Sequence, residues 1–122
     1  MAEAEAVEAF LAKARESLAG AQNEIVNARY NNSINRSYYA CFQAAVAALL
    51  REGVTPSGAQ WEHRFVQSQF VGQLINRRKR FPGEYRDVLS RLFELRRVAD
   101  YQSAYVSAPV AARALRRAKV FV

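Results

Sequence analysis

Hydrophobic positions along this chain recur every three or four residues, the spacing of α-helices that bury one face. Five stretches with this pattern predict helices over residues 3–22, 33–51, 59–78, 84–103 and 108–120. No segment alternates apolar and polar residues as a half-buried strand does, and no Asn-Gly or Asp-Gly hairpin occurs. The pattern therefore predicts an all-α fold, a four- or five-helix up-and-down antiparallel bundle with short loops.

The second predicted helix is apolar almost all round over residues 38–50, which places it at the centre of the fold or of a dimer. Before it, the run 31–33 (Asn-Asn-Ser) supplies N-cap candidates, unless the first helix bends and continues past Asn23. Ser107, with Pro109 two residues later, predicts the cap and first turn of the last helix.

Composition favours one globular domain spanning residues 1–122, since 51% of the residues are hydrophobic. The single cysteine, Cys41, excludes a disulfide within the chain, and its apolar surroundings favour a small core residue over a nucleophile. No basic N-terminal segment precedes an apolar stretch, and no apolar run approaches the ~18 residues of a membrane span. We therefore expect a cytoplasmic protein that does not enter the membrane.

Charge is unevenly distributed along the chain, whose formal net charge is +7. Residues 1–24 carry five Glu against Lys13 and Arg15, a net −3, whereas the remainder carries 16 basic and 6 acidic residues, a net +10. Most of the basic residues are Arg, whose guanidinium makes bidentate contacts with phosphate. A polyanionic partner, with nucleic acid first, is one interpretation; the other is that the basic composition serves solubility alone.

The densest positive run is Arg77-Arg78-Lys79-Arg80, directly before Phe81-Pro82-Gly83, which a helix does not comfortably continue through. Four adjacent cations predict an electrostatic track for an RNA or DNA backbone, with an affinity that falls as the salt concentration rises. The alternative is a solvated surface without a partner.

Arg96 interrupts the apolar stripe of the fourth predicted helix. At 100° per residue it falls between Leu89, Leu92 and Ala99 on the core-facing side. Asp100 follows at the i,i+4 spacing at which two side chains can meet. Because burying an unpaired charge is expensive, Arg96 is expected to line a seam between helices, a cleft or a subunit interface. The alternative is a structural ion pair at the rim of the bundle.

Several familiar kinds of site are missing from the sequence. It has no glycine-rich phosphate loop, no cluster with metal-ligand spacing and no spacing typical of a Ser-His-Asp system, so we expect neither a metal nor a cofactor. What remains is a polar stripe of Arg36, Tyr39 and Gln43 on the second helix. His63, near the start of the third helix, is either a titrating group or a structural one.

Several short motifs follow one another in a distinctive order. They are Asn35-Arg36-Ser37-Tyr38-Tyr39-Ala40, then Phe42, Ala47-Ala48-Leu49-Leu50, His63 with Phe70 downstream, and Arg96-x-x-Ala99-Asp100-Tyr101. Their order and separation resemble the HEPN domains, and more narrowly a small stand-alone subgroup of them, over about residues 14–101.

This resemblance implies a helical bundle, commonly a homodimer with the motif helices near its two-fold axis. Many HEPN members are metal-independent ribonucleases with an Arg-x(4–6)-His motif. Some are toxins paired with a minimal nucleotidyltransferase in prokaryotic toxin–antitoxin or defence systems, and others are ascribed nucleotide binding. The resemblance makes this chain a candidate for the binding of a nucleotide or RNA phosphate through Arg96.

In that interpretation the other candidate residues assist Arg96. Asp100 would orient the guanidinium, Tyr39 and Tyr101 would offer hydroxyl contacts or stacking, and Arg36 with the run 77–80 would add positive field. A nucleotidyltransferase is then the expected partner, and homodimerisation is expected.

The sequence also departs from the ribonuclease motif, because Tyr101 stands where His is expected and no His follows. A tyrosine with its pKa of ~10 exchanges protons poorly near neutral pH. The enzyme alternative is an unconventional metal-independent endoribonuclease in which Arg96 stabilises phosphorane charge and His63 or Tyr101 is the acid or base. His63 can do this only if the fold or a dimer brings it beside Arg96. A third alternative is an interaction module in which Arg96 fixes the register of a dimer.

Overall fold

The computed structural model describes residues 2–56, 60–77, 83–101 and 107–122, and this part of the chain contains helices and no strand. The elements in chain order are α1 (Ala2–Val26), α2 (Tyr30–Arg51), α3 (His63–Gln69), the π-helical η1 (Phe70–Arg77), the 3-10 turn η2 (Gly83–Tyr85), α4 (Val88–Tyr101) and α5 (Ala108–Phe121). The predicted all-α fold is therefore confirmed.

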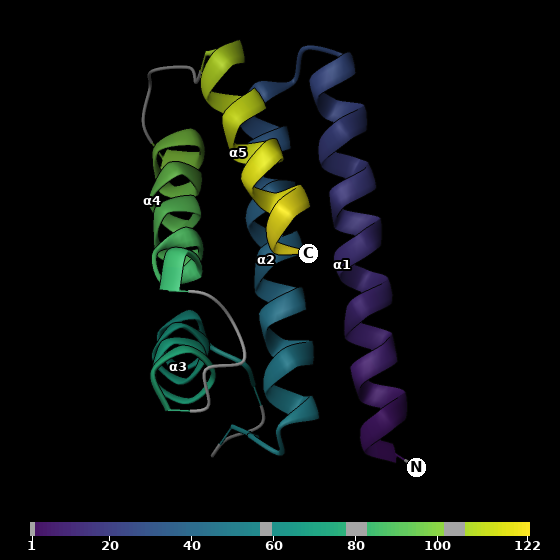
Figure 1. The fold of residues 1–122 in the computed structure, drawn as a ribbon. Helices are drawn as coiled ribbons and strands as arrows, with labels where there is room; N and C mark the ends of the chain where they lie inside the picture. Colours follow the sequence, from purple (N-terminus) through teal and green to yellow (C-terminus); the bar gives the residue numbers. More distant parts are fainter. Residues whose placement is uncertain (1, 57–59, 78–82, 102–106) are drawn as a thin grey trace.

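The long helices run alternately up and down (Figure 1). α1 and α2 form an antiparallel pair along the whole length of the bundle, with α4 on the opposite side of α2 from α1 and α3 below α4. α5 descends across the upper half of α2 and packs mainly on α2 and α1. The predicted up-and-down arrangement is confirmed, with α2 at its centre.

Small buried residues line both α1 and α2 and let the two helices lie close together. They are Ala14, Ser17 and Ala21 on α1, and Ser33, Ser37 and Ala40 on α2. The Ser33 hydroxyl donates to the Ala21 carbonyl at 2.9 Å. The Ser17 hydroxyl pairs with the Gln43 side-chain amide at 2.7 Å. These two bonds satisfy buried hydroxyls and fasten α1 to α2.

The turn between α1 and α2 differs from the sequence prediction. α1 continues to Val26 and α2 begins at Tyr30, so residues 31–33 lie inside α2 and do not cap it. Ala28 adopts a positive φ of 58°, and its N–H donates to the Ile25 carbonyl at 3.0 Å. The prediction that residues 31–33 cap the second helix is wrong, whereas the alternative that the first helix continues past Asn23 is confirmed. The position of the turn was not predicted because a helix end with a positive φ usually has glycine there, and this one has Ala28.

The third and fourth predicted helices are shorter than expected, and the fifth is confirmed. The expected helix 59–78 becomes α3, starting at His63, and then η1, in which Phe70, Leu74 and Ile75 are buried. The expected helix 84–103 becomes η2 and then α4 from Val88 onward. Residues 59, 78, 102 and 103 lie outside the described ranges. In α5, the Ser107 hydroxyl accepts from the Val110 N–H at 3.4 Å, as the cap prediction requires.

The hydrophobic core is built around α2, which contributes more of the core residues than any other helix. Cys41 is fully buried within it, and burial raises the pKa of its thiol, so the expectation of a core residue is confirmed. None of the helices in the described ranges combines the length and apolar character that crossing a membrane requires.

Candidate functional site

Arg96 lies in a seam between α4 and α2. Its guanidinium carbon is 5.3 Å from the ring centroid of Tyr39 and 5.6 Å from that of Tyr38. A guanidinium over aromatic rings at these distances makes cation–π interactions, and the side chain is half-buried. The expectation that Arg96 would line a seam between helices is confirmed.

Tyr38 is the centre around which this site is assembled. Its side chain is only 3% exposed, and its ring contacts those of Tyr39, Phe42, His63 and Phe93 at centroid distances of 5.2 to 5.9 Å. The Tyr38 hydroxyl shares a 2.9 Å hydrogen bond with Nδ1 of His63.

His63, the first residue of α3, completes the group. Its imidazole stacks on the ring of Phe93 from α4, with centroids 3.9 Å apart and an interplanar angle of 14°. Three helices thus contribute to this group: α2 supplies Tyr38 and Tyr39, α3 supplies His63, and α4 supplies Phe93 and Arg96. We call these five residues the Arg96 cluster. The fold of a single chain therefore places His63 in one cluster with Arg96. The sequence alone left open whether the fold or a dimer does this.

The protonation of the cluster follows from its burial and charge. Burial lowers the pKa of His63, the positive charge of Arg96 lowers it further, and Glu94 acts in the opposite direction. Burial raises the pKa of Tyr38 even though Arg96 opposes that shift. At neutral pH the imidazole is therefore uncharged and the phenol keeps its proton. The hydroxyl either donates to Nδ1, leaving the ring proton on Nε2, or accepts from Nδ1–H, leaving Nε2 with a lone pair.

The lowered pKa of His63 predicts a loss of stability in mild acid. Because the folded pKa lies below the ordinary value of 6.5, the stability present above pH 6.5 is lost as the pH falls through the folded pKa. We expect the free energy of unfolding, measured by urea denaturation, to be lower at about pH 5.5 than at about pH 7.5. The His63→Gln variant, which does not titrate, should show a smaller difference. An equal difference in both proteins would contradict this role of His63.

The other candidate residues lie elsewhere or outside what the structure describes. Arg36 is exposed and lies against Gly20 of α1, in a polar groove of about 660 Å³ between α1 and α2. Arg77 is exposed at the end of η1, and Arg78, Lys79 and Arg80 fall outside the described residues. The polar stripe of α2 is thus divided, with Tyr39 in the Arg96 cluster and Arg36 facing α1.

Asp100 and Tyr101 end α4, and their side chains are outside the described part of the chain. The expected pair of Arg96 with Asp100 and the expected role of Tyr101 therefore stay predictions.

Two members of the cluster, Tyr38 and Phe93, were not among the candidate residues. Tyr38 stands beside Tyr39 in the motif run of α2, and Phe93 precedes Arg96 by three residues, a spacing that places both on one side of α4. These signals were present in the sequence. The approach of α3 to α2 and α4 cannot be predicted from the sequence, because it depends on the path of the connection after α2.

The cluster combines a guanidinium, an imidazole and a phenol at one seam, a set able to hold a phosphate and exchange protons. Among the side chains that the structure describes, no three of His, Cys, Asp or Glu lie close enough to hold a metal ion.

Comparison with known protein families gives a match to the HEPN domain over residues 7–122. The matched range includes every member of the Arg96 cluster and all of α2 to α5. Comparison with curated proteins gives no match. The family match covers nearly the whole chain, and the observed helical bundle is the fold that the resemblance of the sequence motifs implies. The chain therefore belongs to the HEPN domain family.

Proposed function

We propose that this chain binds the phosphate of a nucleotide or of RNA at the Arg96 cluster. The observation that supports the proposal is the position of the Arg96 guanidinium over Tyr38 and Tyr39, beside His63. A guanidinium stacks on rings through its faces and binds phosphate through its N–H edge, so Arg96 can make both interactions at once. The rings also fix the direction of the side chain, which lowers the entropy lost on binding.

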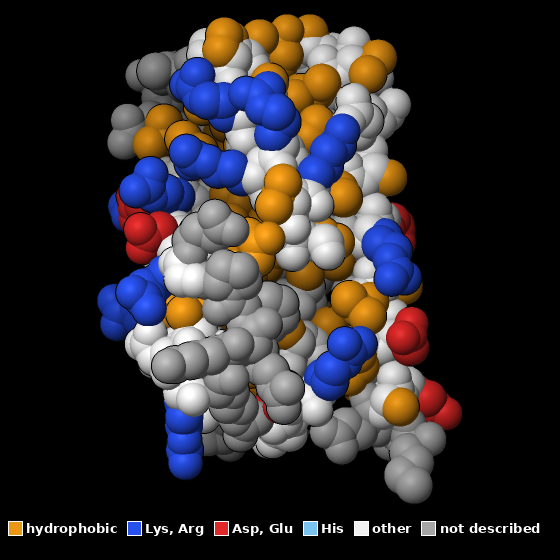
Figure 2. All heavy atoms as spheres, in the orientation of Figure 1, with side chains coloured by type: hydrophobic (Ala, Val, Ile, Leu, Met, Phe, Trp, Pro, Cys, Tyr) orange, Lys and Arg blue, Asp and Glu red, His pale blue; other side chains and the backbone are white. Residues whose placement is uncertain are grey.

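The distribution of charge supports a polyanionic ligand. Figure 2 shows most Lys and Arg side chains of this face over α4 and α5, with acidic side chains among them at the left edge, while further acidic side chains lie with fewer basic ones along α1 at the right edge. This separation matches the negative first 24 residues and the positive remainder of the sequence. Such a field raises the local concentration and the association rate of an anionic partner.

The proposal extends to a wider role, which the likeness to HEPN proteins supports. The chain acts as a single domain over residues 1–122, forms a homodimer, and is one component of a prokaryotic toxin–antitoxin or defence pair whose partner is a minimal nucleotidyltransferase. The support is the resemblance to paired HEPN proteins. A nucleotidyltransferase gene beside this one, and co-purification of the two products, would be the supporting results.

The binding proposal is tested by fluorescence anisotropy with a labelled single-stranded RNA in the presence of EDTA. Loss of a charge-assisted contact predicts that Arg96→Ala weakens binding by about tenfold or more. The matched control is Arg97→Ala, which removes an exposed Arg from the same helix, paired with Glu94 at 3.2 Å. This control should keep nearly the wild-type affinity.

Two outcomes would overturn the binding proposal. Equal affinity of Arg96→Ala and the wild type would show that the cluster does not hold the phosphate. If Arg96→Ala instead shifts only the monomer–dimer equilibrium in sedimentation, the cluster sets the register of a dimer, as in the interaction-module alternative.

A second candidate function is metal-independent cleavage of RNA, and the observation that favours it is the hydrogen bond of His63 with Tyr38 beside Arg96. In such a reaction His63 accepts the proton of the 2′-hydroxyl as its oxygen attacks phosphorus, and Arg96 stabilises the charge that develops on the phosphorus oxygens. The bond from phosphorus to the 5′-oxygen breaks, which leaves a 2′,3′-cyclic phosphate and a 5′-hydroxyl that takes up a proton. Cleavage in EDTA by the wild type separates this candidate from binding alone.

A further inference from the structure

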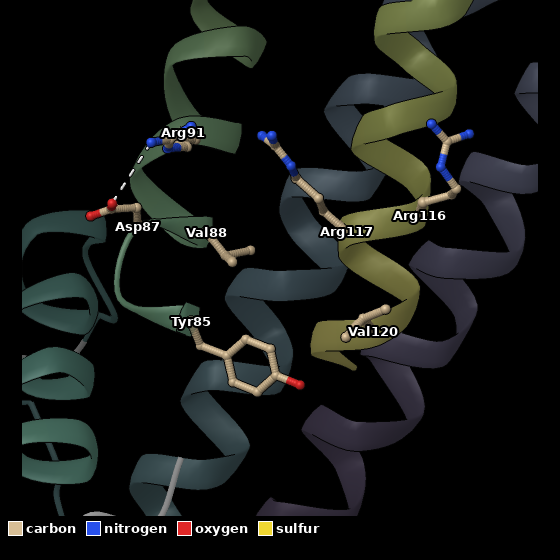
Figure 3. A pocket seen from close by; sticks show the side chains of 7 residues that line it. All are labelled: Tyr85, Asp87, Val88, Arg91, Arg116, Arg117 and Val120. Carbon is tan, nitrogen blue, oxygen red and sulfur yellow. Dashed lines mark ion pairs between the residues drawn. The ribbon is translucent and has the colours of Figure 1, made fainter. Parts of the chain in front are cut away.

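A second candidate site lies between α4 and α5, outside the Arg96 cluster. α5 packs mainly on α2 and α1 and has few contacts with α4, so a hollow of about 410 Å³ remains between them. Its lining residues are Tyr85, Asp87, Val88, Arg91, Arg116, Arg117 and Val120 (Figure 3). This volume lies within the ~300–1,000 Å³ usual for small-molecule sites.

The charges of this α4/α5 pocket favour an anion. Figure 3 shows Arg117 extending from α5 toward Arg91 on α4. Arg91 pairs with Asp87 at 3.9 Å, and because these side chains are 62% and 68% exposed the pair is weak and a stronger anion can replace Asp87. Arg116 and Arg117 have no ion pair with any other described residue. Three Arg against one Asp give the pocket a formal charge of +2.

The lower part of the pocket is apolar and aromatic. Val88 and Val120 lie below the two facing guanidinium groups, with the Tyr85 ring beneath them (Figure 3). Val120 is 67% exposed and offers an apolar surface to a ligand in the pocket. The Tyr85 ring meets that of Phe121 at 5.7 Å, and Phe121 meets the buried Phe70 at 5.3 Å. This row of rings fixes the orientation of Tyr85.

We propose that the α4/α5 pocket binds a phosphate monoester that carries a flat ring, the chemistry of a nucleoside 5′-monophosphate. A phosphate monoester carries about −1.5 to −2 charges at neutral pH, which matches the pocket, whereas an internal phosphate of RNA carries only one. The phosphate lies between Arg91 and Arg117, and the ring lies against Tyr85. The site shares no residue with the Arg96 cluster, so the inference goes beyond the proposed function and does not depend on it.

Isothermal titration with adenosine 5′-monophosphate, inorganic phosphate and adenosine tests the pocket. All titrations use the Arg96→Ala protein, so that binding at the Arg96 cluster does not contribute. We expect the monophosphate to bind more tightly than phosphate or adenosine. Arg117→Ala should weaken its binding about tenfold, the usual loss for one charge-assisted contact.

The ring contact is tested with two variants of Tyr85. Tyr85→Leu should weaken binding of the monophosphate about tenfold and leave inorganic phosphate unchanged, because only the nucleoside stacks. Tyr85→Phe keeps the ring and should keep the affinity, which separates lost stacking from a disturbed fold.

The control is Arg113→Ala, which removes another exposed Arg of α5 that does not line the pocket. Equal losses in Arg113→Ala and Arg117→Ala would overturn the proposal, as would a hexaglutamate peptide that competes as well as the monophosphate. Either result would mark a general anionic surface. Two RNAs that differ only in a 5′-phosphate or a 5′-hydroxyl identify the source of the phosphate monoester. Tighter binding of the 5′-phosphorylated RNA would identify the end of an RNA as the ligand. Equal binding of the two RNAs would identify the free nucleotide.

Discussion

Replacing Tyr38 with alanine is expected to lower the free energy of unfolding by about 3–5 kcal/mol, the range for large aromatic side chains deleted from a core. The ring is almost fully buried and contacts aromatic side chains from α2, α3 and α4. Its removal leaves a cavity where these helices meet. Urea denaturation at neutral pH, followed by far-ultraviolet circular dichroism, measures the loss.

Two matched variants separate the packing of Tyr38 from its hydrogen bond. Tyr38→Phe keeps the ring and removes only the bond to His63, so we expect a loss of about 1 kcal/mol. Tyr39→Ala removes the neighbouring tyrosine, which is only half-buried, and should therefore destabilise less than Tyr38→Ala. A loss in Tyr38→Ala no larger than in Tyr39→Ala would contradict the central position of Tyr38.

The helices could be predicted from the sequence because their information is local. Apolar spacing located every long helix, and the continuous apolar character of residues 38–50 identified the central one. The N-cap prediction for the turn between α1 and α2 was wrong because a tertiary contact competes with the local cap. Ser33, a good local N-cap, gives its hydroxyl to the Ala21 carbonyl of α1, and Ala28 takes the left-handed conformation without glycine.

The candidate site could be predicted only in part. The sequence singles out Arg96 because a charge in an apolar stripe is expected at a seam between helices, a cleft or a subunit interface, and the structure places Arg96 at the seam between α4 and α2. The contact of His63 with Tyr38 joins residues 25 positions apart on different helices. No periodicity in the sequence predicts this contact. The α4/α5 pocket could not be predicted for the same reason, since the sequence alone shows Arg116 and Arg117 only as part of the net charge.

If the Arg96 cluster cleaves RNA, His63→Asn is expected to lower the cleavage rate about 10²- to 10⁴-fold, the usual contribution of a general acid or base. The assay follows a mixed RNA substrate in the presence of EDTA. Because burial and Arg96 lower the pKa of His63, the uncharged base predominates at neutral pH. The rate should therefore rise with pH through a midpoint below 6.5 and be constant near neutrality.

Binding and cleavage can be separated with the same His63→Asn protein. His63 does not carry the charge that holds phosphate, so the variant should bind RNA nearly as well as the wild type while cleaving it far more slowly. Arg96→Ala should lose both, because one guanidinium serves binding and the developing charge. Intact RNA after incubation with the wild type would exclude cleavage and leave phosphate binding as the function of the cluster. Wild-type cleavage that persists in His63→Asn would instead assign the proton transfer to another group, with Tyr101 the first to replace, since it stands where the ribonuclease motif has His.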